Sequence, residues 1–436
     1  MRAFAAKLII CLAGFALLYS VGKSVAALWI LLATSLLSFA AGSVLRSAKK
    51  SYLHELVQRL AVPSAFALIV ALNLTGLIGT LTGSQAKSSD SATALFIAIP
   101  FYLLSAAAFV ADMAKQNHKL PKLINYLVYV TMPFKLLAGP LEPPKLLLQI
   151  EQMTGRIRQI HCLLAWPWIV MGAFMKFVIA NRLEPARHLS QTDPITSILS
   201  AAVFELKFYF DFAGYSFMAY GAALALGLRI NQNFKHPFLA KNVILFWRQW
   251  HISLGQFLSR YVMEPNLHIW QNREQKLVFV SSIFLVSAMW HGGTFNYLLW
   301  GIFHASCYFS YTRWLKRRNN SWLVGLAAML VFFVLGRMLA IDADAGRLLT
   351  RLTHLVDPLA YLDAWRTLNL AGLLMEQEIK ALALAFIFIT AEWFSSRYCE
   401  RRQGYHLFRR PLTSIAMLLI FLLFGIDGGA PLYARL

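Results

Sequence analysis

The sequence predicts an all-α, polytopic integral membrane protein with about eleven transmembrane helices plus re-entrant and interfacial helices. Of the 436 residues, 58% are hydrophobic and only 14% are charged, whereas soluble proteins carry roughly 25% charged residues. Apolar runs recur from one end of the chain to the other, and about 20 apolar residues are enough to cross a bilayer. We find no internal repeat and no low-complexity segment, so a single membrane-embedded domain is expected over residues 1–436.

The expected spans are distributed along the whole chain, at residues 8–21, 25–41, 60–80, 93–112, 161–180, 197–224, 277–290, 294–311, 321–341, 379–396 and 412–427. Residues 1–20 have the pattern of a signal peptide, but a second apolar run follows at once, which favours an uncleaved first helix.

Orientation is predicted from the basic residues around the first four spans. Only Lys23 and Lys87 lie on one side, whereas the other side carries Arg2, Lys7, Arg46, Lys49, Lys50, Arg59, Lys115, Lys119 and Lys122. Because cytoplasmic loops carry the excess of Lys and Arg, the N-terminus is expected in the cytoplasm.

The net charge of +21 comes from 41 Lys and Arg against 20 Asp and Glu. Most of the bases lie in short loops beside apolar runs, so anionic membrane lipids are the expected partners and nucleic acid is not. The four cysteines are scattered without paired spacing, which argues against a disulfide framework and a zinc site, and no metal is expected.

One apolar segment, residues 124–140, has basic residues on both flanks. It is predicted to enter the membrane and return on the same face, with its turn at Met132 or within 138–140. Irregular backbone at that depth requires burial within protein or along a cavity.

Two further segments depart from a simple crossing. Residues 277–311 are expected to form a helical hairpin that breaks at Gly292 and Gly293 and carries His291 at its tip. Residues 231–275 are too polar to span, and their aromatic residues recur at helical spacing between arginines and glutamines. An amphipathic helix at the cytoplasmic interface is predicted there.

The candidate chemistry lies in ionisable side chains within these apolar surroundings. His291 and, forty residues earlier, His251 are the main candidates, because a neutral imidazole with a pKa near ~6.5 suits general-base catalysis. Hydrogen bonding between helices is the alternative role for His291, and anchoring at the interface is the alternative for His251. Asp211 lies one turn from Lys207, so a structural ion pair is its first interpretation and a tunnel-lining role its second.

Five segments, in this order and spacing, resemble the membrane-bound O-acyltransferase (MBOAT) family in its bacterial branch, which esterifies extracytoplasmic polymers: 138–141, 209–216, 233–241, 246–254 and 290–304. The resemblance covers about residues 130–312. Phe217, Gln249 and residues 262–266 depart from the family pattern, and these departures affect the acceptor or donor surface rather than the histidines.

The resemblance implies catalytic roles for His291, as general base, and for His251. It also implies a bacterial cytoplasmic (inner) membrane. The two glycines at the tip of the hairpin would let backbone N–H groups approach the acyl carbonyl. Arg248 is a candidate to hold a donor phosphate or carrier carboxylate, and an interfacial anchor is its alternative role. The residues assigned to substrate binding are Trp290, Gly292, Gly293, Asn296, Arg248 and Asp211.

The implied reaction transfers an acyl group, with acetyl expected, from a cytoplasmic thioester to a hydroxyl of an exported or cell-envelope polysaccharide. The donor is acyl-CoA or an acyl-carrier protein, no cofactor is bound, and an extracytoplasmic acyltransferase is a further candidate partner. D-alanyl transfer from a carrier protein to a teichoic-type polymer is the alternative within this class. A transporter or flippase, or a non-catalytic scaffold, are the alternatives outside it.

Overall fold

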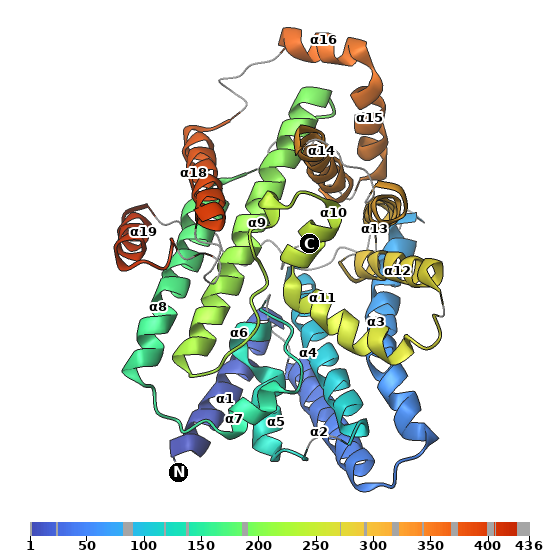
Figure 1. Ribbon diagram of the computed structural model, residues 1–436, viewed down its shortest axis with the longest axis vertical. Coiled ribbons are helices and arrows are strands. Elements are labelled where there is room, and N and C mark those ends of the chain that lie inside the picture. The colour runs from blue at the N-terminus through green and yellow to red at the C-terminus, as the bar shows by residue number, and fades with distance from the viewer. Residues whose placement is uncertain are drawn as a thin grey trace.

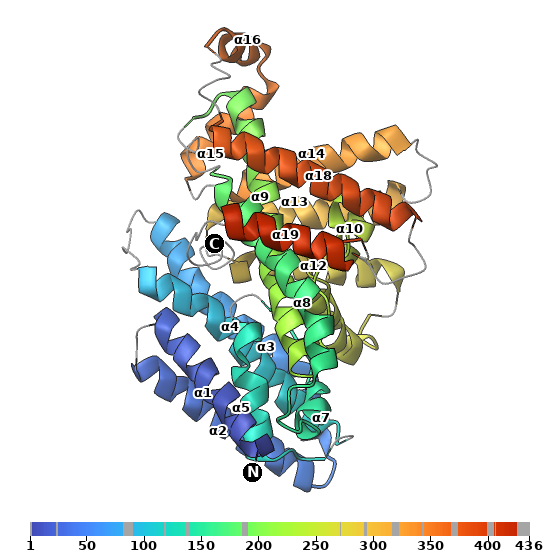
Figure 2. The ribbon, with the colours of Figure 1, turned by 90° about the vertical axis from the view of Figure 1, so that its left-hand side faces the viewer.

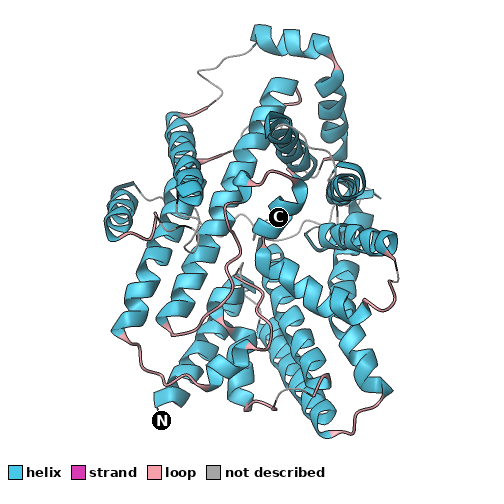
Figure 3. Cartoon of the chain, viewed as in Figure 1, coloured by secondary structure: helices cyan, strands magenta, loops and turns pink. Residues whose placement is uncertain are grey.

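Every regular element in the described part of the computed structural model is a helix, as the hydropathy pattern predicts (Figure 3). The structure describes residues 2–22, 25–81, 90–116, 119–136, 139–184, 191–270, 272–291, 294–315, 322–341, 344–367, 374–398, 405 and 407–424.

A helix occupies each of the expected spans. These helices are α1 (Arg2–Gly22), α2 (Val25–Ser47), α3 (Tyr52–Leu81), α4 (Asp90–Ala114), α8 (Gln159–Ala173), α9 (Pro194–Ala225), α12 (Arg273–His291), α13 (Phe295–Ser310), α14 (Trp322–Ala340), α18 (Glu376–Tyr398) and α19 (Pro411–Phe424). Among the described residues, five stretches are long and apolar enough to cross a bilayer: Arg2–Ser20, Leu28–Ser47, Tyr52–Ala71, Gln159–Arg182 and Glu376–Ser396. The number of about eleven crossings therefore stays a prediction.

The N-terminal helices form one end of the molecule. There α1, α2 and α4 pack with α5 (Leu123–Thr131), and α5 packs on α7 (Leu146–Glu151) (Figures 1 and 2). Their interfaces enclose an apolar cluster that includes Tyr102, Phe109 and Tyr126. This group of helices supports the re-entrant segment that follows it in sequence.

The re-entrant segment is broken at Met132, one of the two predicted positions. The helix α5 ends at Thr131, and a short helix, α6 (Pro133–Leu136), begins at the next proline, whose ring prevents a continuous helix. The buried hydroxyl of Tyr129 donates to the carbonyl of Glu142 at 2.8 Å and ties the segment to the loop beyond it. Ala138 lies outside the described residues, and entry and return on one membrane face stay a prediction.

The centre of the molecule is the pair α8 and α9, which run side by side over most of their length (Figures 1 and 2). The first helix continues as a π-helical turn, η1 (Phe174–Ile179), and ends in η2 (Ala180–Arg182). The two helices cross at Gly172 and Gly214, where a Cβ on Gly172 would lie 2.4 Å from the carbonyl oxygen of Gly214. Only glycine permits this approach, which explains the glycine that follows Asp211 in the 209–216 segment.

The amphipathic helix predicted within residues 231–275 is not continuous, and the position of this segment at the cytoplasmic interface stays a prediction. The segment forms a series of short helices: η4 (Pro237–Leu239), α10 (Val243–Gln249), α11 (Ile252–Leu258), η5 (Ser259–Met263) and η6 (Glu264–Asn266). Trp250, Phe257 and Tyr261 are buried in the main hydrophobic core. The helical spacing of these three residues therefore reflects burial against the protein.

The predicted hairpin is confirmed, since α12 ends at His291 and packs along α13, which begins at Phe295. Thr294 caps α13 by accepting a hydrogen bond from the backbone N–H of Tyr297 at 3.3 Å. Two helices that the sequence pattern did not predict, α15 (Ala345–Val356) and α16 (Pro358–Thr367), form the extremity of the molecule opposite α1 (Figure 1).

Candidate active site

A cavity of about 270 Å³ lies between α9, α12, α13 and α14 and the short helices α10 and α11. Its lining is mostly aromatic and aliphatic, and both candidate catalytic histidines, His251 and His291, belong to it. A mainly apolar cavity with a few convergent polar groups is the usual form of a small-molecule site. The structure thus brings together the two histidines that the sequence places forty residues apart.

His251 sits at the break between α10 and α11, with φ at +45°. The break is held by backbone hydrogen bonds to the preceding segment: Ile252 N–H donates to the carbonyl of Asn233 at 2.9 Å, and Lys235 N–H donates to the carbonyl of Gln249 at 3.0 Å. The ring of Phe212, from α9, meets the imidazole edge-on at a centroid distance of 5.0 Å. The backbone thus turns sharply so that His251 enters the cavity.

The loop after α6 supports the same break. The hydroxyl of Ser253 donates to the side-chain oxygen of Asn233 at 2.5 Å and accepts the backbone N–H of Leu141 at 2.9 Å. Burial and, secondly, the neighbouring His291 lower the pKa of His251 to about 3. The imidazole of His251 is therefore neutral near pH 7 and can donate one hydrogen bond and accept another.

His291 is the last residue of α12 and is half-buried at the cavity wall. Its ring faces two aromatic residues of α13, with centroid distances of 5.9 Å to Trp300 and 6.5 Å to Tyr297. The hairpin geometry explains this contact, because α13 returns alongside the end of α12. In this position the imidazole can exchange a proton with a molecule bound in the cavity.

The polar lining residues that the sequence pattern did not assign to the site include an acidic, an imidazole and a basic side chain: Glu205, His304 and Arg337. The Nε of Arg337, on α14, lies 2.6 Å from Oε2 of Glu205, on α9, and both side chains are buried. His304 packs between Trp300 at 4.4 Å and Phe332 at 4.8 Å. Its ring fits because residue 336 is glycine, where a Cβ would lie 2.9 Å from Nε2 of His304.

The sequence contains a signal for two of these residues, because Glu205 and Arg337 are ionisable residues inside expected spans. Asp211 was a candidate for the same reason. Their pairing joins residues 132 positions apart, and spacing along one helix cannot reveal it.

The substrate-binding residues expected from the sequence have different positions. Arg248 lies at the cavity lining and is exposed. Asn296 is buried in the first turn of α13 and is not among the lining residues. Gly292, Gly293 and the side chain of Trp290 lie outside the described residues.

Asp211 is also absent from the cavity lining, and its structural interpretation fits the geometry best. Its carboxylate lies 2.5 Å from the ammonium of Lys176, in the π-helical turn η1, on a different helix from the Lys207 that the spacing suggested. The ammonium of Lys207 donates to the carbonyl of Leu183 at 2.5 Å. The buried ion pair of Asp211 and Lys176 therefore joins α9 to the end of α8, next to the glycine crossing.

Among the residues that the structure describes, no group of three or more His, Cys, Asp or Glu side chains could hold a metal ion. The rings of His291 and His304 both pack against Trp300, and His251 packs against Phe212.

The family model for MBOAT, the membrane-bound O-acyltransferase family, matches residues 15–343. The chain is 31% identical to a probable alginate O-acetylase of Pseudomonas putida over 217 residues, 48% of this chain and 44% of that protein. It is 27% identical to a peptidoglycan O-acetyltransferase of Helicobacter pylori over 246 residues, 48% and 46% of the two chains.

A teichoic acid D-alanyltransferase of Bacillus subtilis is 28% identical over 186 residues, 38% of this chain and 46% of that protein. The chain thus spans about half the length of the curated relatives it matches. The family model covers most of the chain, including every histidine of the cavity. The chain belongs to the membrane-bound O-acyltransferase family.

Proposed function

We propose that this protein is a membrane O-acyltransferase that moves an acyl group, expected to be acetyl, from a thioester to a hydroxyl of an exported or cell-envelope polysaccharide. The observation that carries the proposal is the presence of His251 and His291 in the wall of one apolar cavity. The names of the relatives, which include acyltransferases of alginate, peptidoglycan and teichoic acid, support it.

In the proposed reaction, His291 takes the proton from the acceptor hydroxyl as the hydroxyl oxygen attacks the thioester carbonyl carbon. The carbon–sulfur bond then breaks, and the departing thiolate receives the proton from the imidazolium of His291. The products are an ester and a free thiol, and the imidazole is neutral again. His251, which is neutral and adjacent, holds the donor or the acceptor by a hydrogen bond.

The donor, acyl-CoA or an acyl-carrier protein, reaches the cavity from the cytoplasm, and the acceptor reaches it from the outer face of a bacterial inner membrane. Arg248, which is exposed at the cavity lining, is proposed to contact the phosphate or carboxylate of the donor side. Backbone N–H groups at Gly292 and Gly293 and the amide of Asn296 remain candidates for stabilising the oxyanion. Anionic lipids around the basic loops, and an extracytoplasmic acyltransferase partner, complete the proposal.

The test compares deletion strains that carry wild-type protein, His291→Ala or His268→Ala at matched membrane levels. His268 is an exposed histidine outside the cavity lining and serves as the matched control. Mild alkali releases ester-linked acids from purified envelope polymers, and mass spectrometry identifies them. We expect acid from the wild type and His268→Ala, and a loss of at least about 100-fold in His291→Ala.

The identity of the released acid separates the alternatives. Acetate supports acetyl transfer, whereas alanine indicates D-alanyl transfer to a teichoic-type polymer. Equal release from all three strains contradicts the role of His291 as a base and favours transport or a scaffold role.

A further inference from the structure

One part of the cavity lining is unlike the rest, because it carries opposite charges. There the carboxylate of Glu205 and the guanidinium of Arg337 form an ion pair with an Nε to Oε2 distance of 2.6 Å. The guanidinium also lies over the ring of Phe208, 4.3 Å from its centroid. Both side chains are buried, with 7% and 9% exposure. An ion pair that faces a cavity retains hydrogen-bonding positions that a bound molecule can use.

The pair lies within reach of the proposed reaction centre. Glu205, Phe208 and Phe212 form one face of α9 along the cavity, and Phe212 touches His251. Seven residues of helix separate Glu205 from Phe212, which is about 10 Å at ~1.5 Å per residue. Arg337 and His291 line the same cavity. A ligand that touches the pair can therefore place a neighbouring group at the histidines.

The lining residues contributed by α10, α11 and η5 have a different chemistry. They include Arg248, Gly255, Ser259 and Met263, and Arg248 is exposed. In the predicted orientation these short helices follow the cytoplasmic end of α9, whereas Arg337 lies about one turn before Ala340, where α14 reaches the outer face. The ion pair is therefore assigned to the side from which the acceptor arrives.

The composition of the cavity lining around the ion pair indicates the class of ligand. The charges of Glu205 and Arg337 compensate each other, so the pair favours a neutral group that both donates and accepts hydrogen bonds over a lone anion. The rings of Phe208, Tyr297 and Trp300, which line the same cavity, offer flat apolar surfaces. Vicinal hydroxyls on a ring with an apolar face, as in a sugar residue, satisfy both requirements.

We propose that Glu205 and Arg337 form the acceptor subsite, which binds hydroxyl groups of a sugar residue and directs the reacting hydroxyl to His291. This inference rests on the proposed acyl transfer and assigns a new role to the two residues. Arg337 donates to sugar oxygens, Glu205 accepts from a sugar hydroxyl, and each holds the other in place.

The test measures acyl transfer in membranes that contain the full chain. Labelled acetyl-CoA is the donor, and oligosaccharides from the deacylated polymer of the deletion strain are the acceptor. The variants are Arg337→Gln, Glu205→Gln and the double variant with both changes, which leaves no unpaired buried charge. We expect KM for the oligosaccharide to rise about 10- to 100-fold, because hydrogen bonds to charged groups are lost. KM for acetyl-CoA should change less than about 3-fold.

Arg351→Gln is the matched control, because Arg351 is a buried arginine on α15 outside the cavity lining. It should leave both KM values as in the wild type. An unchanged KM for the oligosaccharide in a folded double variant overturns the acceptor subsite. Equal rises in KM for donor and acceptor also overturn it, because they indicate a general distortion of the cavity. If the wild type transfers no acetyl group, the proposed function fails and the subsite fails with it.

Discussion

At the scale of single residues, the two candidate catalytic histidines are held by different means. His291 ends a helix, where the hairpin turn exposes it to the cavity, whereas His251 depends on a left-handed backbone with φ at +45°. Such a conformation is uncommon for a residue with a Cβ. His251 therefore has a backbone role that is separable from the chemistry of its ring.

This backbone role predicts an unusual order of stability. His251→Gly should unfold at a higher temperature than His251→Ala, with a free energy of unfolding larger by about 1 kcal/mol. The reason is that a left-handed backbone conformation is unfavourable for alanine and not for glycine. Both variants lack the imidazole and should lose acyl transfer alike. The measurement is thermal unfolding of the purified protein in detergent. A less stable glycine variant, the usual order within a regular helix, would show that the left-handed turn is not maintained.

At the scale of elements, two glycines in helices have opposite surroundings. A Cβ on Gly214 of α9 would lie 2.7 Å from the carbonyl oxygen of Gly172 and 2.9 Å from the backbone nitrogen of Lys176. A Cβ on Gly255 of α11 meets nothing within 4 Å. The first glycine permits the crossing of two helices, whereas the second leaves open space beside the cavity.

Alanine at the two positions should therefore have effects of opposite sign. Gly214→Ala should destabilise the protein by about 1–3 kcal/mol, because backbone atoms of α8 must move. Gly255→Ala should stabilise it by about 0.5–1 kcal/mol through the better helix propensity of alanine. Thermal unfolding of the two variants beside the wild type checks the order. Stabilisation by both substitutions would mean that α8 and α9 are not in close contact.

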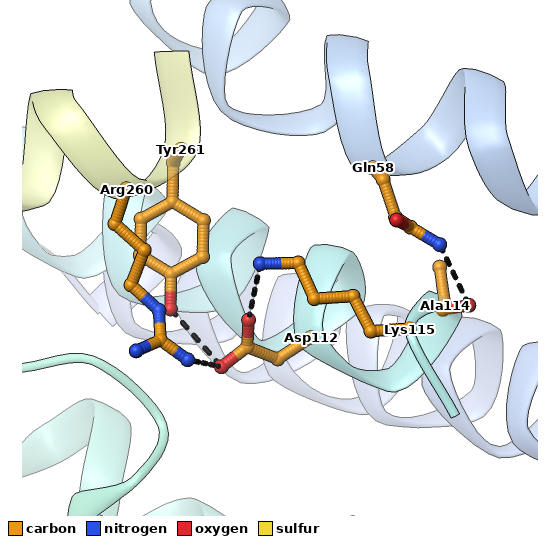
Figure 4. A network of polar contacts seen from close by, with 6 residues as sticks. All are labelled: Gln58, Asp112, Ala114, Lys115, Arg260 and Tyr261. Atoms are coloured by element: carbon orange, nitrogen blue, oxygen red, sulfur yellow. Dashed lines mark hydrogen bonds and ion pairs between the residues drawn. The ribbon is translucent and has the colours of Figure 1, made fainter. Parts of the chain in front are cut away.

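A buried carboxylate connects the short helices near the active site to the N-terminal helices. The carboxylate of Asp112, on α4, is fully buried and accepts hydrogen bonds from Tyr261 at 3.1 Å and Arg260 at 3.3 Å, both on η5 (Figure 4). The ammonium of Lys115 lies 3.5 Å from its other oxygen. Because η5 continues α11, this network holds the segment that begins after His251.

Removal of the charge of Asp112 should destabilise the protein more than removal of one of its hydrogen-bond donors. Asp112→Asn should destabilise the protein by about 2–3 kcal/mol, below the value for a fully buried pair because Lys115 and Arg260 are partly solvated. Tyr261→Phe should cost about 1 kcal/mol. Glu376→Gln, which removes an exposed ion pair with Lys380, is the control and should leave the unfolding temperature unchanged. Equal values for Asp112→Asn and Glu376→Gln would contradict the network.

At the scale of the whole molecule, hydropathy predicted where the helices lie, because an apolar run of sufficient length has few alternatives to a helix in lipid. The proline after Met132 and the glycines after His291 predicted the two breaks for similar local reasons. The subdivision of residues 231–275 was not predictable, because aromatic residues at helical spacing look alike whether they face lipid or protein. The pairing of Glu205 with Arg337 depends on tertiary structure, and no local pattern encodes it.

The proposed function assigns the donor and the acceptor to opposite faces of the membrane, so the orientation of the molecule is the whole-molecule property to test. In a variant without native cysteines, Lys50→Cys, between α2 and α3, is expected on the cytoplasmic face, since this side carries the excess of basic residues. Asp363→Cys, on α16, is expected on the outer face, because α14 runs outward from the basic loop that precedes it. A membrane-impermeant maleimide added to spheroplasts should label Cys at position 363, and position 50 only after lysis. Both positions are exposed, so burial cannot explain a difference. The reverse pattern would show that the molecule has the opposite orientation. The Glu205–Arg337 pair would then lie toward the cytoplasm, which would contradict its assignment to an exported acceptor.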